Sequence, residues 1–90
     1  MIVVSYDIKD DMLRDSFQKL LVKNGAIRLQ YSVYEVNNTK RIMDLLLVKI
    51  ETFSKKFSQK DSVVIFEVGQ EHLKKYGNAV YRDKDIVFFD

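Results

Sequence analysis

Asp7 is the residue whose type and position are best suited to chemistry. Its carboxylate follows a β-branched, apolar run at residues 2–6, and open α/β sheets often carry functional groups at such strand ends. One carboxylate is a poor ligand set for magnesium, because Mg²⁺ requires nearly octahedral oxygen coordination. Two copies of Asp7 near a two-fold axis could share one ion, with Asp10 and Asp11 as further carboxylates nearby. The alternative is that Asp7 caps a helix or accepts a bond in a turn, which its position alone favours.

The rest of the sequence excludes several kinds of catalytic site. His72 is the only histidine, so a histidine metal cluster or a Ser-His-Asp set within one chain is excluded. The chain has no cysteine, and it has neither a glycine-rich phosphate loop nor a dinucleotide-binding fingerprint. His72 follows Gln70 and Glu71 in a polar stretch, which predicts a solvated surface position.

Length and composition indicate one small folded domain. Ninety residues, 47% of them hydrophobic and 12% aromatic, allow a single core, although chains of this size bury only about 60% of their unfolded surface. Without disulfides, packing and oligomerisation must support that core. The net charge of +2 permits an acidic partner without demanding one. The apolar opening at residues 1–4 is too short for a signal peptide or a membrane span, so we expect a cytoplasmic protein without membrane attachment.

Hydrophobic periodicity predicts an alternation of strands and helices. Residues 2–8 are apolar on both alternating faces, as in a central strand. An apolar stripe predicts a helix over residues 12–24, with Asp10 or Asp11 as its cap and Gly25 after its end. The remaining predicted elements are one or two strands within 26–36, a helix over 40–57, a strand over 62–68 and a last apolar run at 86–89.

This order predicts an α+β domain: a ferredoxin-like βαββαβ sheet with both helices on one face and an extra C-terminal strand. We expect residues 1–90 to form one domain, with a core at about 1–69 and a tail strand at about 80–90. Because the strands are apolar on both sides, the face opposite the helices would be bare, and an obligate homodimer would bury it. The tail strand could add to the edge of its own sheet or of the partner's.

Three segments carry a resemblance to a known family. They are Val-Val-Ser-Tyr-Asp-Ile at 3–8, Asp-Asp-Met-Leu-Arg at 10–14 and Arg-Leu-Gln-Tyr-Ser-Val-Tyr-Glu at 28–35. In these segments, in length and in element order, the chain resembles CRISPR-associated protein 2, the small adaptation protein of prokaryotic CRISPR immunity. The resemblance extends over the whole chain.

The resemblance implies roles for individual residues. Asp7 matches the family's metal-binding aspartate, which pairs across the homodimer to hold Mg²⁺ and would be the catalytic residue. Arg14 and Arg28 match arginines that are suited to phosphate contacts. Three further residues lie near the site: Tyr6, Ser32 and Tyr34. The last of them stands where the family usually has phenylalanine.

Positive charge also gathers between residues 40 and 60, where DNA binding by the family would make it a surface for the DNA backbone. The residues concerned are Lys40, Arg41, Lys49, Lys55 and Lys56. The alternative is an ordinary solvated helix face. Arg14 could likewise simply pair with Asp10 or Asp11 on its helix. Arg28 and Glu35 could be ordinary charges on the sheet surface.

The resemblance implies two roles of different class. In the architectural role, the homodimer bridges two dimers of the CRISPR integrase, CRISPR-associated protein 1, and binds double-stranded spacer-precursor DNA during spacer acquisition. In the enzymatic role, the Asp7 pair holds Mg²⁺ in an endonuclease that hydrolyses phosphodiester bonds of RNA or DNA. The residues favour the architectural role, because one carboxylate per protomer without an evident base makes a sparse active site. A third interpretation is a toxin-like ribonuclease similar to virulence-associated protein D, which shares this fold.

Overall fold

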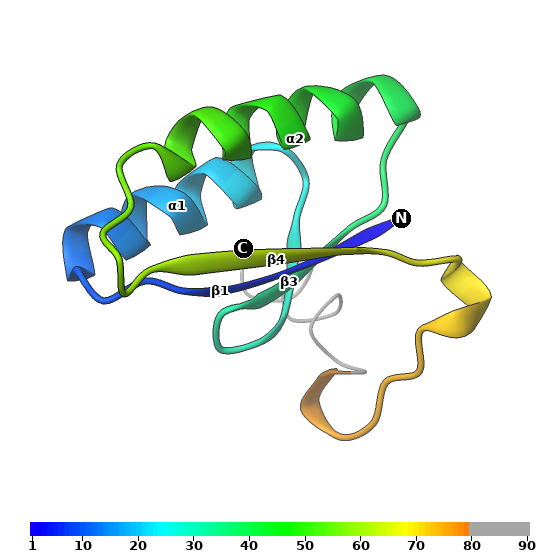
Figure 1. The fold of residues 1–90 in the computed structure, drawn as a ribbon. Helices are drawn as coiled ribbons and strands as arrows, with labels where there is room; N and C mark the ends of the chain where they lie inside the picture. Colours follow the sequence, from blue (N-terminus) through cyan, green and yellow to red (C-terminus); the bar gives the residue numbers. More distant parts are fainter. Residues whose placement is uncertain (80–90) are drawn as a thin grey trace.

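The computed structural model describes residues 1–79, in which two α-helices pack on one four-stranded sheet (Figure 1). The strands are β1 (Ile2–Asp7), β2 (Ile27–Gln30), β3 (Val33–Val36) and β4 (Ser62–Glu67). The helices are α1 (Asp11–Lys23), α2 (Lys40–Ser54) and the short 3₁₀ helix η1 (Gln70–His72). The tail strand predicted at about 80–90, with its apolar run at 86–89, lies outside the described residues.

α1 begins and ends close to the predicted positions. The Asp10 carboxylate accepts a hydrogen bond of 2.8 Å from the Leu13 backbone nitrogen and so caps the helix. The chain leaves the helix through Gly25, whose φ of +88° would be strained for a residue with a side chain. Phe17 and Leu21 are fully buried, which confirms the predicted core stripe.

α2 ends at Ser54 rather than at the predicted position, Phe57. Its start is capped by the Thr39 hydroxyl, which accepts a bond of 3.3 Å from the Ile42 backbone nitrogen. Phe57 follows the apolar spacing because it packs on the core from the next loop, with its ring centroid 6.2 Å from that of Phe17. The apolar spacing therefore indicated which residues pack on the core, but it did not indicate where the helix ends. Within residues 1–79, no helix is both long and apolar enough to cross a membrane.

The sheet has the strand order β2-β3-β1-β4, and every neighbouring pair is antiparallel. β1 is a central strand as predicted, because it pairs with β3 on one side and β4 on the other. The predicted segment 26–36 forms two strands, which are joined by a turn at Tyr31 and Ser32. This small α+β architecture is consistent with the predicted ferredoxin-like fold.

The hydrophobic core lies between the two helices and one face of the sheet (Figure 1). Alternate residues of β1 are buried in it: Ile2, Val4 and Tyr6. They pack with side chains from α1, β3 and α2: Phe17, Leu21, Tyr34, Val36, Leu46 and Ile50. Full burial of one such apolar side chain stabilises the fold by about 1.5–3 kcal/mol. This packing fixes β1, β3 and both helices relative to one another.

The face of the sheet opposite the helices, called here the open face, is partly covered. Residues 69–79 run beneath the sheet on this side (Figure 1), and Leu73 and Tyr76 line a cavity there with Val3 and Leu29. Val3 and Leu29 are both buried. The expectation of a wholly bare face is therefore wrong, because the chain after β4 folds back over the β2–β3 side.

The β4 side of the open face remains exposed. Val64 pairs with Ser5 and Phe66 pairs with Val3, so these side chains lie on the same face as Val3. Val64 is 50% exposed and Phe66 is 53% exposed. An exposed apolar surface of this kind often marks a contact with another segment or another molecule.

Glu35 is a buried residue of the open face. The alternative that it is an ordinary sheet-surface charge is wrong, because it is only 7% exposed and forms an ion pair with Lys75. The partner comes from the segment that folds back over the open face. Lys75 is far from Glu35 in the sequence, so no local pattern could indicate the pair.

Candidate functional site

Asp7 is the last residue of β1, and its side chain belongs to the open face. Successive strand residues alternate, so Asp7 shares this face with Ser5 and Val3. Its carboxylate is 64% exposed and forms a 3.1 Å ion pair with the Lys9 ammonium. Asp7 therefore does not cap α1; that role belongs to Asp10.

A single chain does not offer Mg²⁺ a site at Asp7. Within residues 1–79, no group of three or more histidine, aspartate or glutamate side chains could hold a metal ion. Both predicted reserve carboxylates are engaged elsewhere, since Asp10 caps the helix and Asp11 accepts from Arg14 at 2.5 Å. The donor set fits Mg²⁺ only if a second chain brings another Asp7 and water completes the coordination shell.

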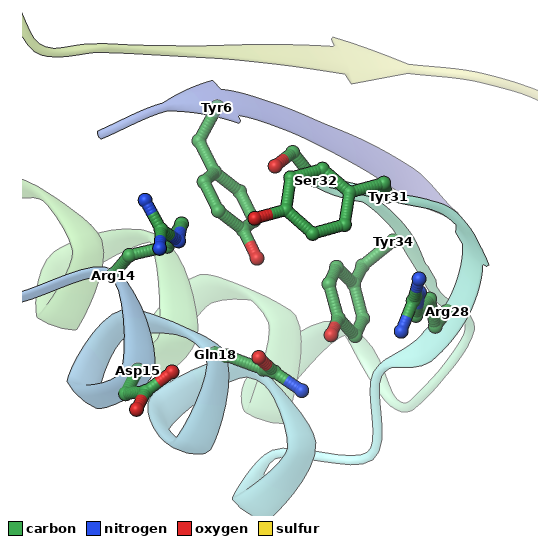
Figure 2. Close-up of a pocket in the computed structure, with 8 residues that line it drawn as sticks. All are labelled: Tyr6, Arg14, Asp15, Gln18, Arg28, Tyr31, Ser32 and Tyr34. Atoms are coloured by element: carbon green, nitrogen blue, oxygen red, sulfur yellow. The ribbon is translucent and has the colours of Figure 1, made fainter. Parts of the chain in front are cut away.

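Five of the predicted residues converge at a different place. They line one cavity of about 120 Å³, called here the arginine cavity, on the helix side of the sheet (Figure 2). The lining residues are Tyr6, Arg14, Asp15, Gln18, Arg28, Tyr31, Ser32 and Tyr34. They come from β1, α1, β2, the β2–β3 turn and β3, so packing of the whole domain assembles the cavity.

Arg14 lines the cavity from α1 with part of its guanidinium already engaged. One nitrogen donates to the Asp11 carboxylate at 2.5 Å and another donates to the Ile8 carbonyl oxygen at 3.1 Å. The hydrogen bond to Asp11 raises the pKa of Arg14 further above its ordinary value. The expected pairing with an aspartate of the same helix is confirmed, and the same side chain also faces the cavity.

Arg28 lines the opposite side of the cavity, beyond the tyrosine rings (Figure 2). Its guanidinium lies over the Tyr31 ring, 5.7 Å from the centroid. Its Nε is buried and has no hydrogen-bond partner among the described residues. A buried donor without a partner costs about 1–3 kcal/mol, and more when it is charged. Arg28 is thus not an ordinary surface charge of the sheet.

Two tyrosines form the back of the cavity. Tyr6 and Tyr34 are 7% and 2% exposed, and their rings stack with centroids 6.1 Å apart. Burial, followed by the neighbouring Tyr34, raises the pKa of Tyr6 to about 12. Both rings are therefore core residues, and the Tyr6 hydroxyl keeps its proton at neutral pH.

Sequence reasoning missed three lining residues: Asp15, Gln18 and Tyr31. Helical spacing could have found Gln18, because residues four apart on a helix share a face and Gln18 follows Arg14 at that distance. Asp15 and Tyr31 gave no comparable signal. Ser32 was predicted, but not its φ of +65°, which turns the chain between β2 and β3.

The five basic residues predicted on α2 and just after it are all exposed, but they are spread along the helix: Lys40, Arg41, Lys49, Lys55 and Lys56. A helix of fifteen residues is about 22 Å long. At its start Lys40 pairs with Asp44 at 2.8 Å, and beyond its end Lys56 lies 5.1 Å from the centroid of the Phe53 ring. None of the five lines the arginine cavity. Their role as a DNA-backbone surface stays a prediction.

His72 occupies the predicted solvated position. Its side chain is 75% exposed, and its Nε2 lies 3.5 Å from the Glu71 carboxylate.

Comparison with known proteins connects this geometry to a family. The chain is similar to a crystal structure of a hypothetical protein, TT1823, from Thermus thermophilus, with 27% identity and a TM-score of 0.66. The similarity covers 84% of this chain and 88% of the other. No curated protein matches the sequence significantly. The model of the family "CRISPR associated protein Cas2" matches residues 1–76, so this chain belongs to the Cas2 family.

Proposed function

We propose that this chain acts in CRISPR adaptation as a homodimer that bridges two integrase dimers and binds spacer-precursor DNA. Family membership supports a CRISPR-associated role. The observation that carries the dimer is the half-exposed apolar surface of β4, at Val64 and Phe66. Burial of apolar area yields about 25 cal/mol per Å², and a second copy of the same face is its simplest cover.

The contact between the two copies must extend beyond those two side chains. A stable interface buries about 800 Å² per partner. On the open face, Ser5, Asp7 and Ser62 continue the surface of β1 and β4. A two-fold axis in this area brings the two Asp7 carboxylates towards each other, so dimerisation and the shared Mg²⁺ site are one proposal.

The nucleic acid would be held by charge rather than by base recognition. Arg14 and Arg28 offer phosphate contacts at the arginine cavity, and the basic residues of α2 offer exposed charge along the helix. Double-stranded DNA is the proposed ligand, and RNA remains an alternative because phosphate contacts do not distinguish the two. The sum of such contacts predicts strong salt dependence of binding.

Phosphodiester hydrolysis is the second candidate activity. A bound Mg²⁺ would activate water and neutralise charge on the scissile phosphate. This chain's residues supply little else, because Asp7 is exposed, is paired with Lys9 and has no histidine beside it. The bridging role needs surfaces only, so it is favoured. No specific observation favours the toxin-like ribonuclease similar to virulence-associated protein D.

The test is co-purification of the chain with its cognate integrase and a short DNA duplex, with and without Mg²⁺. We expect a complex that contains two copies of this chain and two integrase dimers, and that survives Asp7→Ala. Metal-dependent cleavage of RNA or DNA is expected to disappear in the same variant. Failure of the wild-type chain to join the integrase would overturn the bridging role, and undiminished cleavage by Asp7→Ala would overturn the catalytic one.

A further inference from the structure

We propose that the arginine cavity binds one terminal phosphate group, a phosphomonoester at the end of a nucleic acid strand, in preference to an internal phosphodiester. The inference rests on the proposed function only in that the ligand is a nucleic acid. Its evidence is the size of the cavity, its charge and the unpartnered donor of Arg28.

The size of the cavity limits what can enter. Its volume of about 120 Å³ is well below the roughly 300–1,000 Å³ of pockets that enclose whole small-molecule ligands. A phosphate group with a few waters fits this space, whereas a nucleoside does not. An internal phosphodiester is bonded to the strand on both sides, so the strand would have to leave the cavity in two directions. A terminal phosphate is bonded to the strand on one side only.

The charge of the lining favours an anion with more than one negative charge. Among the described residues the lining holds two guanidinium groups, Arg14 and Arg28, and one carboxylate, Asp15, while Arg14 is also paired with Asp11 outside the lining. A phosphomonoester carries about −1.5 to −2 charges at neutral pH, whereas an internal phosphodiester carries one. The monoester therefore gains more from the same pair of arginines.

Arg28 supplies the most specific part of the argument. Its buried Nε has no partner among the described residues, so one donor of the guanidinium fork is not used by the protein. Arginine binds phosphate through two parallel N–H···O bonds, which lysine cannot reproduce. Nε has almost no accessible surface, so the Arg28 side chain would have to turn for a phosphate oxygen in the cavity to reach it. That contact would remove the cost of leaving a charged donor unpaired in a buried position.

Neutral donors complete the lining. Figure 2 shows the hydroxyl groups of Tyr6 and Tyr34 directed towards α1, where Gln18 lies. The pKa of Tyr6 is about 12, so its hydroxyl stays protonated and adds no negative charge to the lining, where it already shares hydrogen bonds with Tyr34 and Ser32. A terminal phosphate has three oxygens not bonded to carbon, one more than an internal phosphodiester, and can use more of these donors.

The experiment compares three short single strands of one sequence, each labelled at an internal base. One has a 5′-phosphate, one has a 3′-phosphate and one has hydroxyls at both ends. Binding is measured by fluorescence anisotropy at physiological ionic strength. We expect one or both phosphate-ended strands to bind the wild-type protein at least about tenfold more tightly than the hydroxyl-ended strand, because a charge-assisted bidentate contact is gained. The two arms identify which end is recognised.

Variants assign the preference to the cavity. Arg28→Lys keeps the charge but loses the fork, so the preference is expected to disappear. Lys19→Gln removes one positive charge from an exposed position of α1 outside the cavity and is expected to keep it. Asp15→Asn removes the one carboxylate that the described residues contribute to the lining and is expected to increase the preference.

A measurement on the wild-type protein avoids any dependence on how the variants fold. Titration with inorganic phosphate is expected to shift the Arg28 Nε–Hε resonance in the NMR spectrum and to abolish the preference for phosphate-ended strands. Equal binding of the three strands, or an Arg28 resonance that does not respond, overturns the inference. If duplex binding in the integrase complex then persists, the proposed function stands and only the terminal-phosphate inference fails.

Discussion

The arginine cavity and the Asp7 position lie on opposite faces of the same strand, and they are built in different ways. Tyr6 points into the core, where five segments of one chain close the cavity around it. Asp7, the next residue, points to the open face, where its only charged contact within the described residues is the exposed Lys9. The cavity is complete in a single protomer, whereas the proposed Mg²⁺ site at Asp7 would need a second copy. Adjacent residues of a central strand can thus belong to sites with different requirements for assembly.

The largest effect is expected from breaking the proposed dimer. Phe66→Asp places a charge on the apolar surface of β4, where burial against a second copy would leave it unpaired. We expect the variant to be monomeric by light scattering, while phosphate still shifts the Arg28 resonance. Met12→Asp, on an exposed position of α1, is the matched control and is expected to remain dimeric. If Phe66→Asp keeps the mass of the wild-type dimer in light scattering, β4 does not form the interface.

The neighbours Tyr6 and Asp7 are expected to differ strongly in their contribution to stability. Tyr6→Ala removes a buried ring and should lower the free energy of unfolding by about 3–5 kcal/mol. Asp7→Ala removes an exposed ion pair and should change it by less than about 1 kcal/mol. Urea denaturation at one fixed protein concentration measures both. Similar values for the two variants would contradict the contrast between a core position and a surface position.

The Lys75–Glu35 ion pair can test what holds residues 69–79 against the open face of the sheet. Lys75→Gln leaves the buried carboxylate without its charged partner, and we expect a loss of about 1–3 kcal/mol. Adding Glu35→Gln to this variant should recover part of the loss, because the buried charge is then gone. Thermal unfolding of the wild type, the two single variants and the double variant gives the coupling free energy between Lys75 and Glu35. Strict additivity would mean that the segment over β2 and β3 is not held by this pair.

The smallest effect concerns the loop that follows Asp7. The Asp61 carboxylate accepts bonds from the backbone nitrogens of Lys9 at 2.9 Å and Ser58 at 2.8 Å, which lowers its pKa. Because the folded pKa lies below the unfolded one, this contribution is fully present above about pH 4 and is lost as the pH falls through the folded value. Asp61→Asn should reduce the acid dependence of stability below about pH 4. If the free energy of unfolding measured in urea falls with decreasing pH equally in the variant and the wild type, this role of Asp61 is contradicted.

Much of the fold followed from local patterns in the sequence. The start of α1, the glycine after it and the core stripe with Phe17 were predictable because capping, turn and burial rules act over a few residues. The end of α2 was not, since Phe57 keeps helical spacing while packing from a loop. Glu35 was assigned to the surface because its partner Lys75 is distant in sequence.

The site was predictable residue by residue but not as an arrangement. The family resemblance indicated Arg14, Arg28 and Tyr34 separately, yet their meeting depends on the turn at Ser32 and on the register between β2 and β3. The unpartnered Nε of Arg28 is a property of packing that no sequence pattern reports. Asp7 was identified from its place at a strand end, and the proposal that it needs a second copy to bind Mg²⁺ rests on the small number of carboxylates around it in residues 1–79.

Light scattering of the purified wild-type chain at micromolar concentration tests the homodimer most directly. The proposed pairing through the open face predicts a mass of about 21 kDa, twice the 10.6 kDa of one chain. A stable species of 10.6 kDa under these conditions would contradict it, and with it both the shared Asp7 site and the bridge between integrase dimers.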